Sequence, residues 1–193
     1  MKRRDLTPEK IILSYIALAE KMGLAQVTFP RLAEALGIKP PSLYNHFKNL
    51  TDLKVHTAIF LHEKLHEYLT TQLMGKTKEV ALLTYGESYR TFALKYQAVY
   101  ELLNTIPSFN NDALLLAGRK NTVLLSQLLF SFGLSEEEVL MESRGFRSLL
   151  HGYVSLSQLG YFQNAMLDAD ESFVAVLVQF VETIEKKAEN SHH

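Results

Sequence analysis

Residues 28–47 constrain the fold more strongly than any other stretch of the chain. Leu32, Ala33 and Leu36 recur there at the spacing of one helical face. Gly37 follows them at the position where a left-handed residue commonly ends a helix, and the apolar Ile38 can fold back under the turn. We therefore expect a short helix that stops at Gly37 instead of continuing through the stretch.

A second short helix is expected over residues 42–47. Pro41 suits its first turn, where the missing N–H of proline costs nothing. Leu43 and Phe47 are four residues apart and point inward, which leaves an outward face made of Ser42, Tyr44, Asn45 and His46. Two short helices joined in this way predict a helix-turn-helix, whose second helix enters the major groove of DNA.

Residues 7–55 resemble the DNA-binding domain of TetR-type bacterial transcriptional regulators. The matching positions are Gly23, Thr28, Leu32-Ala33, Leu36-Gly37-Ile38, Ser42-Leu43-Tyr44 and His46-Phe47. One position departs from the family, because Leu50 stands where members commonly carry a lysine that contacts DNA phosphate. Lys48 is then the nearby cation for that phosphate. The alternative is a helical hairpin in an unrelated bundle.

The net charge of −1 is divided unevenly along the chain. Residues 1–56 hold nine Lys and Arg against five Asp and Glu, whereas the remainder holds eleven against sixteen. Basic charge is therefore concentrated where phosphate binding requires it. We expect Lys39, Ser42 and Asn45 to face base edges and Tyr44 and His46 to lie against phosphate and sugar. The expected DNA-binding residues are Thr28, Lys39, Ser42, Tyr44, Asn45, His46 and Lys48. The N-terminal Lys2, Arg3 and Arg4 either reach the DNA as a basic arm or form a solvated tail.

Composition narrows the class of protein further. A chain of 193 residues with 47% hydrophobic content is expected to fold around a substantial core. No run of 18 apolar residues and no signal region is found, and the chain has no cysteine, so we expect a cytoplasmic protein without disulfides. The terminal His192 and His193 are treated as remnants of a tag.

Helical patterns run through the whole chain and predict an all-α fold. Thr7 and Pro8 open a first helix that ends at Gly23, and Asn49 with Asp52 opens a long helix over residues 50–73. That long helix should connect a DNA-binding domain, residues 1–55, to a helical effector-binding and dimerisation domain, residues 56–193. Further helices are expected over residues 79–103, from a break near residues 107–111 to 132, from Ser135 to 159, and from a cap at Asp170 to 189.

An aromatic stripe marks the helix expected over residues 79–103. Its members, spaced by 4, 3, 4 and 4, are Tyr85, Tyr89, Phe92, Tyr96 and Tyr100. They either pack in the core or line a pocket, since buried tyrosine hydroxyls need partners. Arg144, Arg147 and His151 share a helical face and either hold a carboxylate of a ligand or pair with Glu142 or Asp168. The resemblance implies a small-molecule effector, with site residues Tyr85, Tyr89, Phe92, Tyr96, Arg147 and His151.

The last two helices carry signs of self-association. The stretch Leu149-Leu150-His151-Gly152-Tyr153 resembles the C-terminal domain of a TetR subgroup named for a Trp-His-Gly triplet, although the Trp is absent here. The final helix is apolar beyond one stripe, which favours burial against the chain's own body and against a second copy. The resemblance implies a homodimer formed through Phe173, Leu177, Phe180, Val181 and Ile184.

A zinc-protease pattern, H-E-x-x-H, occurs over residues 62–66. His62 and His66 would share a helical face and bind zinc, with Glu63 as the base. The extended form of the motif fails at Leu69 and Gln72, so we expect a chance match, no metal, no cofactor and no enzyme.

The sequence therefore predicts a repressor that binds a palindromic operator and is released from it by an effector. We expect the release to involve movement of the helix over residues 50–73. The alternatives are an effector-independent DNA-binding adaptor of the same fold and a zinc metalloenzyme.

Overall fold

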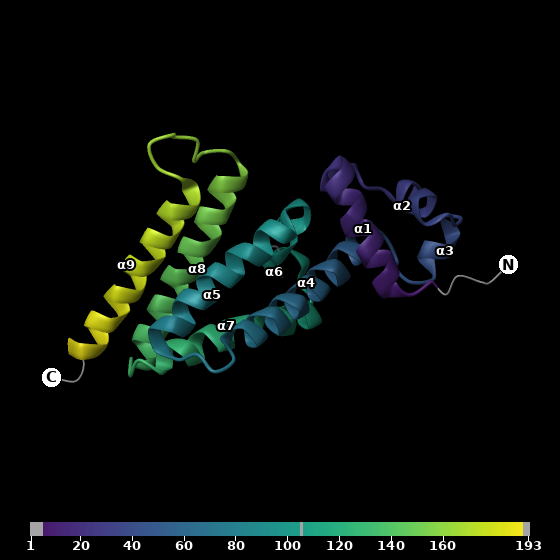
Figure 1. Cartoon of the computed structure of the whole chain (residues 1–193). Helices are drawn as coiled ribbons and strands as arrows, with labels where there is room; N and C mark the ends of the chain where they lie inside the picture. The colour runs from purple at the N-terminus through teal and green to yellow at the C-terminus, as the bar shows by residue number, and fades with distance from the viewer. Residues whose placement is uncertain (1–5, 105, 191–193) are drawn as a thin grey trace. The chain divides into compact units, whose positions relative to one another are not determined.

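The computed structural model describes residues 6–104 and 106–190. Within these residues the chain forms only helices and turns, as expected (Figure 1). The elements are α1 (Pro8–Met22), η1 (Leu24–Gln26), α2 (Phe29–Leu36), α3 (Pro41–Tyr44), α4 (Leu50–Leu73), α5 (Lys78–Lys95), η2 (Gln97–Asn104), α6 (Ile106–Phe109), α7 (Asp112–Phe130), α8 (Glu136–Gln158) and α9 (Ala169–Asn190). None of the described helices has the length and apolar character needed to cross a membrane.

The chain divides into two compact units. The first contains the residues up to Glu63 together with Tyr96–Gly118, and the second contains Lys64–Lys95 together with the residues from Arg119 onward. The first unit includes η2 because η2 packs against α1. The division of roles expected at residues 55 and 56 stays a prediction. The basic residues Lys2, Arg3 and Arg4 lie outside the described residues.

The first unit is built on α1. The Thr7 hydroxyl accepts a hydrogen bond from the Lys10 N–H at 3.3 Å, and Pro8 occupies the first turn, which confirms the expected start. Gly23 ends the helix with a φ of 83°. The side chains that face the core, all at most 6% exposed, are Ile11, Ile12, Tyr15, Ile16 and Ala19. The helix expected over residues 50–73 is also confirmed as α4.

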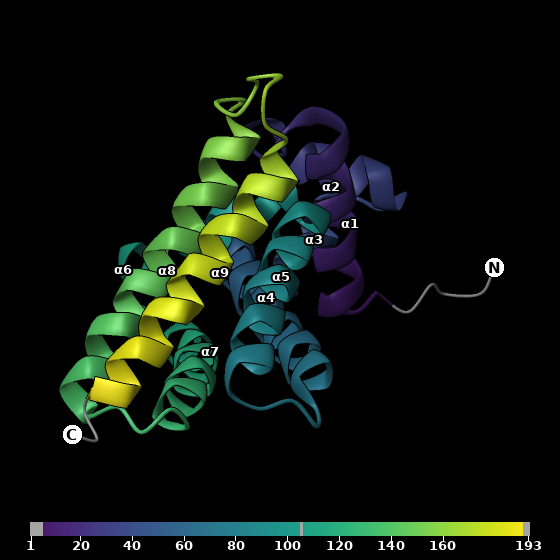
Figure 2. The ribbon, with the colours of Figure 1, turned by 60° about the vertical axis from the view of Figure 1, so that its left-hand side comes forward.

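The core of the second unit lies between α5, α8 and α9, which contact one another pairwise. Helices α8 and α9 run side by side in opposite directions (Figures 1 and 2). The capping box expected at Ser135 and Glu138 is present at the start of α8. Gly86 permits the close approach of α5 and α9, because a Cβ at this position would lie 2.6 Å from a Leu177 methyl carbon.

The helix expected over residues 79–103 is wrong in its second half. α5 ends at Lys95, and the chain continues as a 3₁₀-helix, η2. The five aromatic residues therefore do not share one helix, because Tyr96 and Tyr100 lie beyond α5 and in the other compact unit. Packing explains the change: Val99 and Leu102, and likewise Tyr100 and Leu103, are buried pairs three residues apart, the repeat that a 3₁₀-helix aligns.

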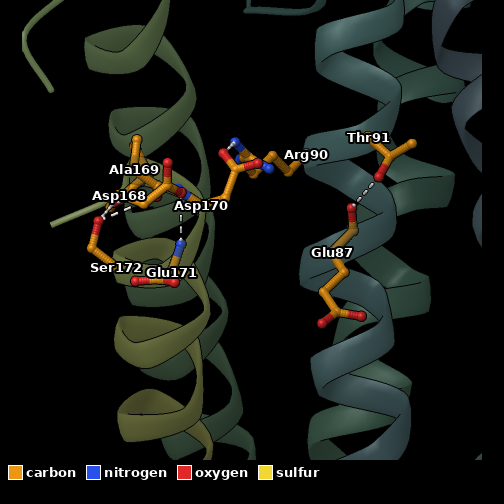
Figure 3. Close-up of polar contacts among 9 residues, drawn as sticks. Glu87, Arg90, Thr91, Asp168, Ala169, Asp170, Glu171 and Ser172 are labelled. Carbon is orange, nitrogen blue, oxygen red and sulfur yellow. Dashed lines mark hydrogen bonds and ion pairs between the residues drawn. The ribbon is translucent and has the colours of Figure 1, made fainter. Parts of the chain in front are cut away.

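The cap of α9 is also different from the expectation. Asp168, not Asp170, accepts hydrogen bonds from the backbone N–H groups of Asp170, at 2.7 Å, and Glu171, at 3.3 Å (Figure 3). The Asp170 carboxylate instead pairs with Arg90 of α5, whose guanidinium lies 5.2 Å from the centre of the Phe173 ring. The Asp168 cap and the contacts of Arg90 with Asp170 and Phe173 thus both stabilise the start of α9.

Candidate nucleic-acid interface

The turn between α2 and α3 has the geometry that the sequence predicts. Gly37 is left-handed, with φ 66° and ψ 36°, and the Ile38 N–H donates to the Ala33 carbonyl at 2.9 Å. Leu43 and Phe47 are 0% and 1% exposed. These buried contacts fix α3 relative to α2 and leave the opposite side of α3 for solvent or a partner.

Helix α3 is a single turn, Pro41–Tyr44, and is therefore shorter than expected. The chain keeps a helical course after it, because the His46 and Phe47 N–H groups both donate to the Leu43 carbonyl at 3.0 Å. The expected DNA-binding side chains that are exposed are Thr28, Lys39, Tyr44, Asn45 and Lys48, whereas Ser42 and His46 are half-buried. All seven belong to the α2–α3 region or to the turn that follows it.

Two contacts here could not be predicted from the sequence. The ring of Phe29, in the first turn of α2, lies edge-on against Tyr44 at 5.0 Å between ring centres, so it orients a side chain that is 58% exposed. The exposed Arg31 donates to the Gln26 carbonyl at 2.7 Å. Arg31 adds a cation beside the motif, and the helical spacing of residues 29–36 was the only signal for its outward position.

The start of α4 is braced by a reciprocal cap. The Asn49 side chain accepts from the Asp52 N–H at 2.9 Å, and the Asp52 carboxylate accepts from the Lys48 N–H at 2.8 Å. His56 lies 3.3 Å from the same carboxylate and packs edge-on against Phe47, with ring centres 5.3 Å apart. The backbone of Lys48 is thereby fixed, while its ammonium group remains available for an anion.

The expected effector residues are only partly brought together. Tyr85 and Phe92 are 3% and 5% exposed, and Tyr89 is half-buried. The Tyr85 hydroxyl donates to the Asn121 carbonyl at 3.4 Å. Burial raises the pKa of Tyr85, the nearby Tyr89 adds to the increase, and the positive charge of Arg147 opposes it. Tyr85, Tyr89 and Arg147 therefore interact electrostatically, whereas Tyr96 lies in the other unit.

The α8 side chains expected to bind a ligand lie at the surface of their unit. Arg144, Arg147 and His151 are exposed. Of the two acids considered as their partners, Glu142 pairs with Lys187, and Asp168 caps α9. Partial burial lowers the pKa of His151.

The expected dimer residues need a correction. Phe173, Leu177, Val181 and Ile184 are at most 3% exposed within a single chain, because they pack in the unit's own core. They cannot form the surface offered to a second copy. Phe180 is half-buried, and its ring lies 4.9 Å from that of Phe146.

The residues of the H-E-x-x-H pattern all belong to α4. Glu63 is exposed and His62 is 6% exposed. Throughout residues 6–104 and 106–190, no three His, Cys, Asp or Glu side chains are grouped closely enough to hold a metal ion.

A helix-turn-helix unit together with a second, entirely helical unit defines a class of DNA-binding transcriptional regulators. Family comparison makes the assignment specific. Residues 16–53 match the model described as bacterial regulatory proteins, tetR family, and residues 82–180 match the model described as tetracyclin repressor-like, C-terminal domain. The chain therefore belongs to the TetR family of transcriptional regulators. The Trp-His-Gly subgroup stays a prediction.

Individual relatives agree with this assignment. The chain is 26% identical to the HTH-type transcriptional regulator Rv0681 of Mycobacterium tuberculosis, over 94% of this chain and 83% of the relative. It is 29% identical to the class D tetracycline repressor of Escherichia coli, over 48% of this chain and 42% of that protein. The crystal structure of TetR from Acinetobacter baumannii has the same fold, with a TM-score of 0.72, 20% identity and coverage of 95% and 99% of the two chains. The crystal structure of a single-residue variant of that TetR, in complex with minocycline, gives a TM-score of 0.71 at 20% identity over the same shares.

Proposed function

We propose that this protein is a homodimeric repressor that binds a palindromic operator and leaves it when a small molecule binds. The observation that carries the proposal is the exposed row of Thr28, Lys39, Tyr44, Asn45 and Lys48 on and beside a buried, firmly packed α2–α3 pair. Acting on chromosomal DNA places the protein in the cytoplasm. It needs no catalytic group or metal for this role.

The contacts divide into two kinds. Lys48 precedes the braced start of α4 and replaces, at the phosphate, the lysine that Leu50 does not provide. Asn45 and Lys39 carry the hydrogen-bonding groups suited to base edges. Tyr44, held by Phe29, lies against phosphate and sugar.

Selection of a duplex from random DNA, followed by gel-shift titration at several salt concentrations, tests this division. Lys48→Ala should weaken all duplexes similarly and reduce the log–log salt slope by about 1, because one phosphate contact is lost. Asn45→Ala should instead cost about 1–3 kcal/mol on the selected site and relax its sequence preference. Lys120→Ala, an equal charge change at an exposed residue of the other unit, is the control. Equal affinity for selected and scrambled DNA at physiological salt would disprove specific binding.

The effector is proposed to bind in the second unit near Tyr85, Tyr89 and Arg147. Support comes from the partly polar, aromatic setting of α5 and from the minocycline bound by a protein of the same fold. Thermal shift against a metabolite panel will identify the ligand. If no metabolite in the panel binds and the protein still binds its operator normally, the effector-independent adaptor is favoured.

The dimer face is proposed on the outward side of α8 and α9. Met141, Gly145, Ser148, Gly152 and Leu156 recur along α8 at intervals of four, three, four and four. Met141 and Leu156 are 55% and 41% exposed, and a Cβ at Gly152 would meet no atom within 4 Å. At Gly145 a Cβ would lie 3.6 Å from the Phe180 ring of α9, so the stripe borders α9 there, whereas Met141, Gly152 and Leu156 face away from their own chain. The small residues of the stripe allow a second helix to approach closely.

Analytical ultracentrifugation of two variants tests whether dimerisation depends on this face in particular or on exposed apolar residues of α8 in general. Met141→Glu should convert dimer to monomer at micromolar concentration, because it buries a charge in the apolar contact. Leu140→Glu is the matched control, since Leu140 is 53% exposed on the same helix but lies off the stripe. Dissociation by both variants, or by neither, would exclude the proposed face.

A further inference from the structure

Helix α7 carries an exposed apolar face. Leu116, Val123 and Phe130 are 61%, 45% and 46% exposed. They are spaced seven residues apart on one continuous helix, so they lie in a line along one side of it. The other side of α7 packs inside the chain, where Leu125 and Leu129 are 0% exposed. Helix α7 is therefore apolar on two sides, and the chain itself covers only one of them.

The regular spacing distinguishes this face from scattered surface residues. Single exposed apolar side chains are common on folded proteins and need no explanation, whereas a continuous apolar stripe indicates a contact surface. A seven-residue repeat is the spacing at which one helix packs along another. The face from Leu116 to Phe130 covers about 21 Å of the helix axis, at 1.5 Å per residue. We therefore expect a partner that is itself a helix.

The polar residues beside the apolar ones restrict what this partner helix can be. Arg119 and Lys120 are exposed four and three residues before Val123, and neither forms an ion pair with any described residue. The neutral Ser126 and Gln127 stand three and four residues after Val123. A matching partner offers hydrogen-bond acceptors to the two cations and does not bring cations of its own against them.

A second copy of α7 meets these requirements when it runs antiparallel across a two-fold axis at Val123. Each residue before Val123 then meets the residue equally far after it in the other copy. The facing pairs are Leu116 with the partner's Phe130, Arg119 with the partner's Gln127, and Lys120 with the partner's Ser126. A parallel pair would instead set Arg119 against the partner's Arg119. An acidic helix of another protein suits the two cations alone, whereas the second copy suits the apolar and neutral residues as well.

We propose that two copies of this chain associate through α7 in this antiparallel register. The contact uses none of the residues of the face proposed on α8 and α9, so it joins two α8–α9 dimers into a tetramer and does not depend on them. Its apolar line is one residue wide, and we expect it to bury less than the about 1,200 Å² that marks the lower end of standard interfaces. Such a contact is weak and forms at high protein concentration.

Disulfide formation tests the register directly, because the chain contains no cysteine. Val123→Cys places two thiols against each other at the two-fold axis, so oxidation with copper phenanthroline should link two chains. Leu115→Cys is the matched control, since Leu115 is 58% exposed on the same helix but lies about 100° around it from Leu116. Val123→Cys should form linked pairs of chains about tenfold faster than Leu115→Cys. Equal rates would overturn the proposal.

A pair of variants tests the antiparallel direction. Leu116→Cys or Phe130→Cys alone places its two thiols about 21 Å apart along the helices, which is too far for a disulfide. An equimolar mixture of the two variants should therefore link about tenfold faster than either variant alone. Linking of Leu116→Cys alone as fast as the mixture would contradict the antiparallel register.

Sedimentation velocity checks the association without a cross-link. Val123→Lys sets two further cations against each other at the axis, so it should weaken the step from dimer to tetramer about tenfold or more. Leu115→Lys should change that step by less than about twofold. A parent protein that forms no assembly through this step at high concentration would overturn the proposal.

The Met141→Glu background separates this contact from the proposed α8–α9 face. Val123→Cys should link in that background as fast as in the parent, because α7 pairs on its own. If the parent itself lacks the α8–α9 dimer, the α7 step appears as monomer to dimer and Val123→Lys still weakens it. Linking that disappears with Met141→Glu would show that α7 forms no independent contact.

Discussion

Gly86 shows how much one atom matters where α5 and α9 approach most closely. A Cβ there would lie 2.6 and 2.7 Å from the two methyl carbons of the buried Leu177, so the helices must separate or Leu177 must leave its rotamer. Gly86→Ala should lower the free energy of unfolding by about 1–3 kcal/mol, measured by urea denaturation. The exposed Glu87→Ala should change it by less than about 0.5 kcal/mol. A Gly86→Ala protein as stable as the parent would show that this contact is not tight.

Glu185 gives the second unit a dependence on pH. A hydrogen bond with Glu79 raises the pKa of Glu185 above 4.5, as do slight burial and the charges of Glu79, Glu189 and Glu182. An acid with a raised folded-state pKa binds more protons in the folded state, so its stabilising effect is present at low pH and is lost as pH rises through the folded pKa.

Glu79→Gln should therefore gain stability relative to the parent as pH rises from about 4.5 to 7, because it removes the repulsion between carboxylates. Urea unfolding at each pH measures the difference, which salt should reduce. Glu87→Gln controls for the loss of an exposed charge on the same helix. A difference that is constant with pH would exclude carboxylate coupling.

At the scale of elements, the start of α9 allows the stability contributions of a helix cap and of an ion pair to be measured separately. Asp168→Ala should cost about 1 kcal/mol, because two backbone N–H groups lose their acceptor, and Asp168→Asn should retain most of that stability. Asp170→Ala removes the partner of Arg90, whose side chain is 16% exposed, and leaves the cap in place. Urea denaturation of the three variants measures each contribution. A cost for Asp168→Asn as large as for Asp168→Ala would argue against a capping role.

Elements were predictable where local chemistry and packing agree. The Thr7 and Ser135 caps, the Gly37 turn and the full length of α4 follow from short-range rules. The end of α5 could not be predicted, because the contact of η2 with α1 joins segments far apart in sequence. The cap of α9 was misplaced by two residues, since Asp168 and Asp170 are chemically equivalent and only Arg90, distant in sequence, distinguishes them.

The site was predictable to a similar degree. The outward positions of Tyr44, Asn45 and Lys48 follow from the inward positions of Leu43 and Phe47. The prediction of the dimer residues was wrong in part. The sequence cannot show whether an apolar side chain such as Leu177 packs within its own chain or against another.

At the scale of the whole molecule, effector and operator must oppose each other equally. If the effector weakens operator binding by a given factor, saturating operator must weaken effector binding by the same factor. Calorimetry with and without operator checks this equality, once the ligand is known. Tyr89→Ala should leave operator affinity intact and abolish release, and it is preferable to Phe92→Ala, because Phe92 is 5% exposed and its loss would destabilise the core. Equal effector affinity in both conditions would exclude a switch.

The pairing of Arg90 with Asp170 has a consequence for synthesis on the ribosome. The two residues are 80 positions apart, so at about 5–20 residues per second α5 waits roughly 4–16 s before the start of α9 exists. During that interval the face of α5 around Gly86 has no cover, and chaperones or other nascent chains can bind it. The contact of α1 with η2 needs no residue beyond Asn104, and the first unit needs none beyond Gly118, so the first unit can fold while the rest of the second unit is still being translated.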